Sequence, residues 1–249
     1  MKLKKRKKLH NFPGVIVEKF LNKNFCNKII VELNRFNNFD DFVMSGRNRI
    51  NKGSNNFQKF LENSKFAKNL FKKFNKKKTF QNIEKSLSKV DDFNFNYNVK
   101  NYSFSKTNYG LQKGMRLVKK NYNSKKNVIN LDVDFSVSEK GYCRGPHKDR
   151  ESRILNFLIY LNSIPKKEGG SLVLYKPKKN YSKLSRFPLI SNLSKLETVT
   201  PVTGRAIFFK STPFSYHAVK KFLPSKKRKR YFIYGSFSLN KKVSWQVNV

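Results

Sequence analysis

Two histidines and one aspartate are the residues of this chain best suited to bind a metal. His147 and Asp149 belong to the triplet His147-Lys148-Asp149, and His217 lies seventy residues further along. On an extended backbone, residues two apart point to the same face, so one strand end can offer both side chains to one metal. Two imidazoles and one carboxylate are the ligands of the 2-His-1-carboxylate site, which leaves open positions on Fe(II) for substrate and oxygen. The pattern predicts an iron site, and the third histidine, His10, receives no role in it.

The same three ligands would also suit a zinc hydrolase. Such an enzyme needs a general base beside the metal. The chain has only 15 acidic residues. Those nearest in sequence are Asp134, Glu139 and Glu151. This alternative is therefore weaker than the iron site.

The charge of the chain is strongly positive. Lysine and arginine number 55, which gives a formal net charge of +40. Such a charge favours contact with a polyanion such as a nucleic acid, an anionic glycan or a membrane surface. A lysine- and asparagine-rich composition inherited from an AT-rich genome is the other explanation. No zinc-finger, RRM or helix-turn-helix motif appears, which argues against sequence-specific reading of bases.

The chain also carries indications of its compartment. No apolar run reaches the roughly 18 residues needed to span a bilayer. The basic start, Met1 to Lys8, is not followed by the continuous apolar stretch of a secretory signal. Cys26 and Cys143 lack zinc-like spacing, and free thiols are usual in a reducing cytoplasm. We therefore expect a cytoplasmic protein without a membrane span.

The first part of the chain has helical periodicity. Residues 1–11 form a basic tail that we expect to be disordered, and Val15 to Leu21 reads as a short strand. Asn22 is a suitable N-cap for a helix over about 23–36. Apolar residues at helical spacing predict a second helical stretch over about 56–74 and a short helix near 80–87.

After about residue 90 the pattern becomes that of short strands separated by turn residues. Many short strands of this kind favour a sandwich or a barrel. Residues 177–199 interrupt the strands and predict a long loop over the site. The fold class is therefore mainly β with N-terminal helices. The predicted strands are Val128–Val137, Ile154–Leu161, Ser171–Tyr175, Arg205–Phe209, Tyr216–Val219 and Tyr231–Leu239.

The order of several motifs resembles the Fe(II)/2-oxoglutarate-dependent dioxygenases, in particular their prolyl 4-hydroxylase-like branch. Each motif is modest by itself, but their order and spacing over about residues 128–239 make the resemblance specific. The motifs are Gly145-Pro146-His147-Lys148-Asp149, Tyr160-Leu161-Asn162, Gly169-Gly170, Gly204 to Phe209, His217 with Val219, and Arg230-Tyr231 followed by Gly235-Ser236-Phe237.

The resemblance implies a double-stranded β-helix, or jelly roll, flanked by α-helices. Residues 12–249 would form one catalytic domain, with a helical layer over about 12–90 and a jelly-roll core over about 128–239. The implied reaction couples the oxidative decarboxylation of 2-oxoglutarate to hydroxylation of a substrate. Its requirements are Fe(II), 2-oxoglutarate, O2 and ascorbate as reductant.

The resemblance further implies two residues that bind the cosubstrate. The C5 carboxylate of 2-oxoglutarate needs a deep cation, and the planar fork of an arginine suits it. Arg230 holds the matching place, although Arg228 in the same basic run is a rival. Tyr160 is implied as a hydroxyl donor to that carboxylate. Tyr142, Arg153 and Asn156 are assigned more loosely to the substrate side.

The substrate is left open. Candidates are a prolyl or other protein side chain, a glycan or small metabolite, or a nucleobase. A nucleic-acid oxidative demethylase of the same superfamily is one alternative, favoured by the charge. That branch usually has a second arginine six residues after the first, where this chain has Ser236. A non-catalytic polyanion-binding jelly roll is another alternative, but nothing in the ligand set indicates loss of turnover.

Overall fold

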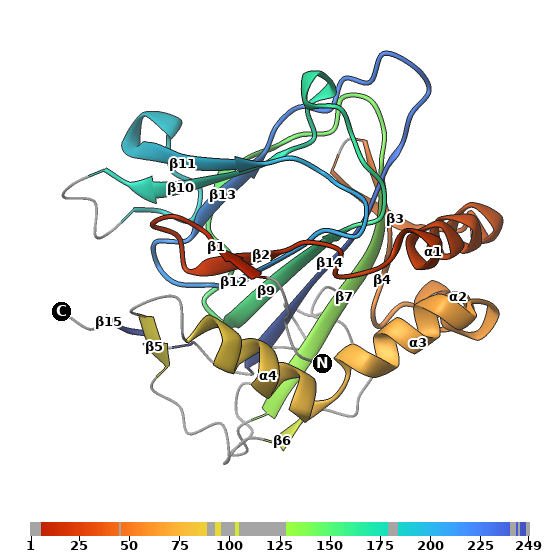
Figure 1. Ribbon diagram of the computed structural model, residues 1–249, viewed down its shortest axis with the longest axis horizontal. Coiled ribbons are helices and arrows are strands. Elements are labelled where there is room, and N and C mark those ends of the chain that lie inside the picture. The colour runs from red at the N-terminus through yellow and green to blue at the C-terminus, as the bar shows by residue number, and fades with distance from the viewer. Residues whose placement is uncertain are drawn as a thin grey trace.

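Two antiparallel sheets face one another in the computed structural model, with helices on one side (Figure 1). The structure describes residues 6–44, 46–88, 93–95, 103–104, 128–178, 184–239, 243 and 245–247. The fold is mainly β with N-terminal helices, and its two sheets form a jelly roll, as the sequence predicted.

The larger sheet supplies one wall of the molecule. In spatial order it contains β1 (Arg6–Lys8), β2 (Gly14–Val17), β12 (Ala206–Lys210), β9 (Arg153–Tyr160), β14 (Arg230–Leu239), β7 (Val128–Ser138), β4 (Arg47–Asn51) and β3 (Asp40–Met44), and β6 (Ser103–Phe104) pairs with β7. The smaller sheet contains β11 (Leu193–Val199), β10 (Leu172–Pro177), β13 (Tyr216–Val219) and β8 (Arg144–His147). A separate pair joins β15 (Trp245–Val247) to β5 (Phe93–Phe95).

The central strands of the larger sheet are buried on both faces. On β9, Leu158 and Tyr160 pack between the two sheets, whereas Phe157 and Ile159 pack toward the helices. This alternation is the period of two that a strand imposes. Ile154 has the same even numbering as Leu158 and Tyr160 but packs on the helix side, because the register of β9 against β14 shifts at this point.

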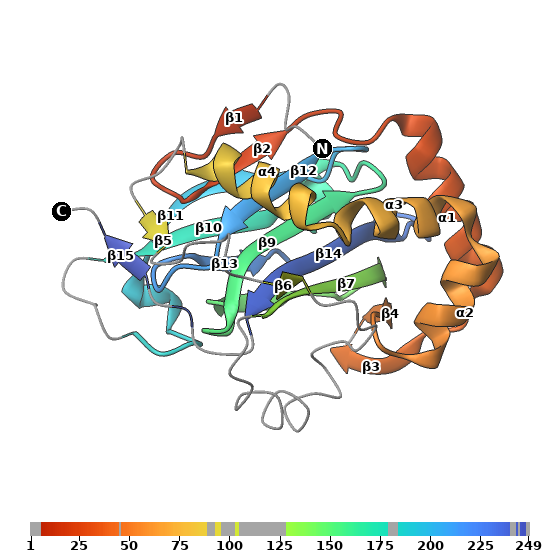
Figure 2. The ribbon, with the colours of Figure 1, turned by 90° about the horizontal axis from the view of Figure 1, so that it is seen from below.

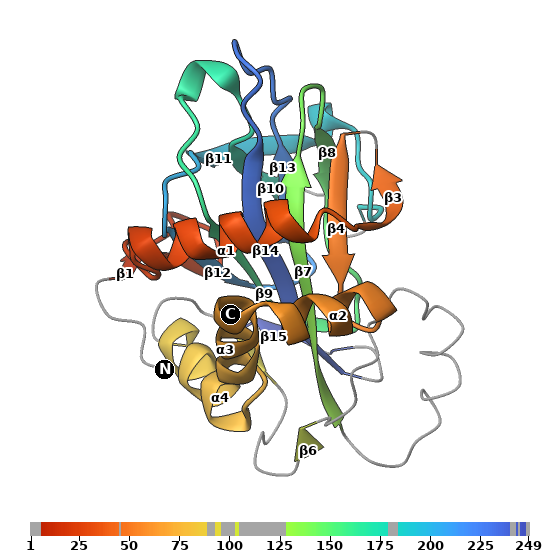
Figure 3. The ribbon, with the colours of Figure 1, turned by 90° about the vertical axis from the view of Figure 1, so that its right-hand side faces the viewer.

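Four helices cover the outer face of the larger sheet (Figures 2 and 3). They are α1 (Lys23–Phe36), α2 (Asn55–Asn63), α3 (Lys65–Phe74) and α4 (Lys77–Leu87). Asn22 caps α1 by accepting a hydrogen bond from the amide of Phe25, as predicted. The predicted helical stretch 56–74 is divided at Ser64, whose extended backbone ends α2 and whose hydroxyl caps α3.

Two predictions for irregular segments were wrong in part. Residues 6–8 of the basic tail form β1, because their backbone pairs with β2. Residues 193–199 of the predicted loop form β11, which pairs with β10. Residues 1–5 and 179–183 of these two segments lie outside the described residues. None of the described helices is long and apolar enough to span a membrane.

Candidate metal centre

The register of two short strands brings the predicted histidines together. In the smaller sheet β8 pairs with β13, and His147 stands directly opposite His217. Their ring centroids are 4.3 Å apart. Asp149 follows β8, and one ligand atom from each of the three residues lies within 4.8 Å of the others. All three side chains are buried. The structure therefore assembles the set that the sequence predicted.

Hydrogen bonds orient both imidazole rings. His147 Nδ1 lies 2.9 Å from the carbonyl oxygen of Gly145, and His217 Nδ1 lies 3.3 Å from that of Ser215. A carbonyl oxygen only accepts, so each Nδ1 carries the proton in these contacts. The free Nε2 of each ring is then the atom available to a metal.

The protonation states match those that a metal needs. Burial and the neighbouring His217 lower the pKa of His147 to about 2, and burial likewise lowers the pKa of His217. Burial alone would raise the pKa of Asp149, but the charge of Arg153 lowers it below its usual value. Metal ligands must be neutral imidazoles and ionised carboxylates. All three residues are in these forms at neutral pH.

Asp149 is held by two side chains of the larger sheet. Arg153 Nη1 donates to Oδ1 at 2.5 Å, and the Tyr234 hydroxyl donates to Oδ2 at 3.1 Å. The sequence placed Arg153 on the substrate side, whereas the structure places it against a metal ligand. Tyr234 was not predicted, although it lies four residues after Arg230 on one strand and therefore shares its face. Asn156 is buried, with its side-chain oxygen 3.4 Å from the Tyr234 hydroxyl.

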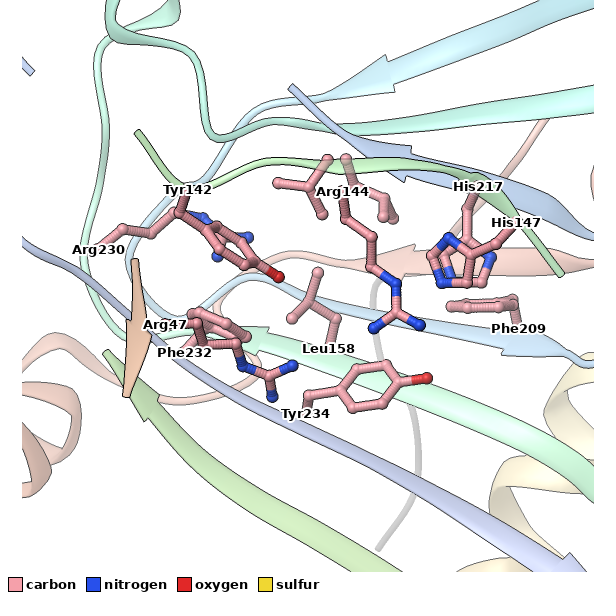
Figure 4. A pocket seen from close by; sticks show the side chains of 12 residues that line it. Arg47, Tyr142, Arg144, His147, Leu158, Phe209, His217, Arg230, Phe232 and Tyr234 are labelled. Carbon is pink, nitrogen blue, oxygen red and sulfur yellow. The ribbon is translucent and has the colours of Figure 1, made fainter. Parts of the chain in front are cut away.

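A pocket of about 460 Å³, part of it open to solvent, extends from the two histidines between the sheets. Figure 4 shows Arg230 at the end of this pocket away from the histidines. Apart from the histidines and Arg230, the pocket is lined by Arg47, Tyr142, Arg144, Leu158, Leu172, Phe209, Val219, Phe232 and Tyr234.

Arg230 is buried and has no hydrogen-bonding partner among the described residues. Its side chain is 1% exposed, and none of its three guanidinium nitrogens has a hydrogen bond within the described residues. Its Cζ lies 4.1 Å from the ring centre of Phe232 and 5.2 Å from that of Tyr160. Burial lowers its pKa. A Cβ on Gly170 would lie 2.9 Å from Arg230 Cδ, so a glycine at this turn leaves room for the arginine.

The neighbouring candidates are placed differently. Arg228 donates to Glu168 at 2.7 Å and lies near the surface, outside the pocket lining. Tyr160 is fully buried beside Arg230, and its hydroxyl has a long contact of 3.5 Å with the carbonyl of Val199. Lys148, between the two ligands in sequence, donates its ammonium group to the carbonyl of Leu184.

Comparisons with known proteins agree with this geometry. Residues 133–237 match the model of the 2OG-Fe(II) oxygenase superfamily. This region of the chain belongs to that superfamily of enzymes, with His147, Asp149 and His217 as its facial triad. A search of curated protein sequences finds no match.

Solved structures of low sequence identity share the fold. A prolyl 4-hydroxylase from Phytophthora capsici matches with 14% identity and a TM-score of 0.52, over 92% of this chain and 59% of its own. HygX from Streptomyces hygroscopicus, solved with nickel and 2-oxoglutarate, matches with 10% identity and a TM-score of 0.51, over 91% of this chain and 83% of its own. A 2OG-Fe(II) oxygenase family oxidoreductase from Burkholderia pseudomallei matches with 8% identity and a TM-score of 0.51, over 93% of this chain and 86% of its own. At these identities the likeness supports the jelly-roll fold alone.

Proposed function

We propose that this protein is a hydroxylase that couples the oxidative decarboxylation of 2-oxoglutarate to hydroxylation of a substrate C–H group. One atom of O2 enters succinate, which leaves with CO2, and the other becomes the hydroxyl of the product. Bound Fe(II) supplies the redox chemistry that activates dioxygen. The nitrogen and oxygen donors of His147, Asp149 and His217 fit that ion.

The chain's own residues would orient this metal site. The carbonyls of Gly145 and Ser215 hold the two imidazoles with Nε2 free. Arg153 and Tyr234 fix the carboxylate of Asp149. Hydrogen bonds to metal ligands set their direction and affect metal affinity by about 10- to 100-fold.

The observation that carries the proposal is the unpartnered Arg230 in the same pocket as the two histidines. A buried charge without a partner is costly, and a bidentate carboxylate would satisfy it. We assign the C5 carboxylate of 2-oxoglutarate to Arg230. Tyr160 would turn its hydroxyl to the same carboxylate, because its present contact with the Val199 carbonyl is long.

The test is succinate formation. Purified protein with Fe(II), ascorbate and 2-oxoglutarate should release succinate slowly by itself and faster with a substrate. His147→Ala should release none, whereas His10→Ala, which alters an exposed histidine outside the site, should match the unaltered protein. Absence of succinate from iron-loaded protein, with and without a broad panel of substrates, would refute the enzymatic proposal.

The proposal also covers the substrate, the cellular compartment and the reductant. A prolyl or other protein side chain is our first candidate. A polyanion such as a nucleic acid is the second, because a surface hollow gathers basic side chains: Lys140, Lys226, Lys227, Arg228 and Lys229. We further propose that residues 12–249 act as one catalytic domain in the reducing cytoplasm, with ascorbate as reductant. The two free cysteines, Cys26 and Cys143, are consistent with such a compartment.

A further inference from the structure

The pocket at the metal centre is rich in guanidinium groups. Arg47, Arg144 and Arg230 all line it, and among the described residues no aspartate or glutamate does. Arginine is the side chain that binds planar anions in bidentate fashion. An arginine in this pocket that has no anionic partner is therefore a candidate to bind an anionic ligand.

Arg47 already pairs with a carboxylate of the protein, that of Asp134. Its Nη2 donates to Asp134 at 3.1 Å, and its Nε and Nη2 both donate to the hydroxyl of Ser136. Its guanidinium also lies 5.1 Å from the ring centre of Phe232. Arg47 is thus fixed by β7, where it shares the carboxylate of Asp134 with Arg49, although it still borders the pocket. Arg230 is assigned above to the cosubstrate.

Arg144 is in a different situation. It lies on β8 three residues before His147 and opposite Val219 of β13. The side chain is half-buried, and it has no hydrogen bond or ion pair within the described part of the chain. Figure 4 shows its guanidinium in the pocket, between Tyr234 and the two histidines. Its charge contributes to lowering the pKa values of His147, Asp149 and His217.

The charges of the proposed complex leave Arg144 in excess. Fe(II), Arg230 and Arg153 together carry four positive charges, and Asp149 and the two carboxylates of 2-oxoglutarate offset three of them. Arg153 is satisfied by Asp149 and the Tyr234 hydroxyl. Arg144 is half removed from water and has no ion-paired carboxylate among the described residues, which favours an anionic ligand.

We propose that Arg144 binds an anionic group of the substrate, a carboxylate or a phosphate, beside the metal centre. This inference rests on the proposed function and specifies its substrate class. The same guanidinium fork suits both anions. Its place next to the histidines would hold the anion close to the reacting atoms, so that the hydroxylated carbon lies within a few bonds of the charged group.

The test uses protein loaded with Mn(II) and saturating 2-oxoglutarate, so that binding is measured without turnover. Two pairs of probes differ in charge: benzoate against benzamide, and benzyl phosphate against benzyl alcohol. Calorimetric titration should show the anionic member of at least one pair binding at least tenfold more tightly. The pair with the larger ratio distinguishes a carboxylate from a phosphate.

Variants connect the preference to the residue. Arg144→Gln should abolish the tenfold preference, Arg144→Lys should restore part of it, and Arg150→Gln should keep it. Arg150 is six residues away, outside the pocket lining, so it controls for the loss of one charge. Anionic probes that bind no better than neutral ones, or an Arg144→Gln variant that keeps the preference, would overturn the proposal.

Two further measurements distinguish a failure of the Arg144 inference from a failure of the proposed function. The Kd for 2-oxoglutarate should rise far more in Arg230→Gln than in Arg144→Gln, and equal increases would assign Arg144 to the cosubstrate and overturn the inference. Thermal unfolding checks that Arg144→Gln is folded. If the unaltered protein binds neither Mn(II) nor 2-oxoglutarate, the proposed function fails first and the inference falls with it.

Discussion

The two faces of the larger sheet are built from the same strands but differ in what they bury. On the outer face, Phe157 of β9 stacks on Phe74 of α3 with ring centroids 4.5 Å apart. On the inner face, β14 presents Arg230, whose three guanidinium nitrogens have no hydrogen bond in the part of the chain that the structure describes. The outer face stabilises the fold through apolar packing, whereas the inner face contains a charge that lowers stability unless a ligand binds.

This difference separates residues that stabilise the fold from residues that bind the ligand. Burying an unpaired charge costs several kcal/mol, so Arg230 does not serve the stability of the empty protein. Phenylalanines in the outer layer contribute about 3–5 kcal/mol each against truncation. Substitutions on the two faces should therefore separate binding from stability.

The largest effect should follow the loss of a metal ligand. His217→Ala leaves only two donors and should weaken Mn(II) binding by more than about a hundredfold, beyond the range for residues that merely orient ligands. Metal titration measures this loss, and circular dichroism should show a retained fold. An unchanged metal affinity would remove His217 from the site.

A substitution on the outer face should lower the stability of the fold instead of metal binding. Phe157→Ala should lower the free energy of unfolding by about 3–5 kcal/mol, because it leaves a cavity against Phe74. Urea unfolding measures the change. Phe187→Ala serves as the control, because that ring is 64% exposed and should cost much less. A small cost at Phe157 would mean that the outer layer repacks easily.

Truncation of Arg230 should affect binding without loss of the fold. Arg230→Ala removes two charge-assisted hydrogen bonds and should raise the Kd for 2-oxoglutarate about a hundredfold, or about 2.7 kcal/mol. Arg228→Ala should change it less than threefold, since Arg228 pairs with Glu168. Similar effects of the two substitutions would reverse the assignment. Arg230→Met should also raise the thermal stability of the ligand-free protein, because an apolar side chain replaces the unpaired charge.

The smallest expected effect is the contribution of Lys52 to the pH dependence of the free energy of unfolding. It tests a buried charge on the outer face. Lys52 is a buried cation beneath α3, bonded to the Leu131 carbonyl, and burial lowers its pKa from 10.5 to about 8. The unfolded chain therefore binds more protons between pH 8 and 10.5, so the free energy of unfolding rises as the pH rises through this range. From pH 7.5 to 10 this contribution is about 2 kcal/mol.

The control for Lys52 is a comparison of variants. Lys52→Met should lose the contribution to the pH dependence, whereas Lys59→Met, at an exposed position on α2, should keep it. Urea unfolding at the two pH values measures the difference. Parallel pH profiles for Lys52→Met and the unaltered protein would show that Lys52 titrates normally.

The sequence predicted the metal ligands because their side-chain types are rare in this chain and their spacing follows strand geometry. It did not separate Arg230 from Arg228 by residue type, since both stand in one basic run. The strand period of two, extended from Phe232 and Tyr234, places Arg230 on the inner face. The contribution of Arg47 was not predictable, because it depends on β4 pairing with β7 across a long separation in sequence.

Two further differences between the predicted and the observed elements have local causes. Ser64 reads as an ordinary polar position within a helical pattern, and only its contacts with Ala67 and Glu32 reveal that it ends one helix and starts another. The strand β1 carries three exposed basic residues and forms through backbone pairing with β2, with one surface ion pair between Lys7 and Glu197. Side-chain pattern contains no signal for such a strand.

The position of β8 at the edge of the smaller sheet has a mechanical consequence. This four-residue strand pairs within that sheet with β13 alone, yet it supplies His147 and leads directly to Asp149. An ion shared by His147 and His217 would fasten the edge strand to its neighbour, much as a reversible cross-link does. Metal loading should then slow hydrogen exchange at the amides of β8 more than at those of the central strands β9 and β14.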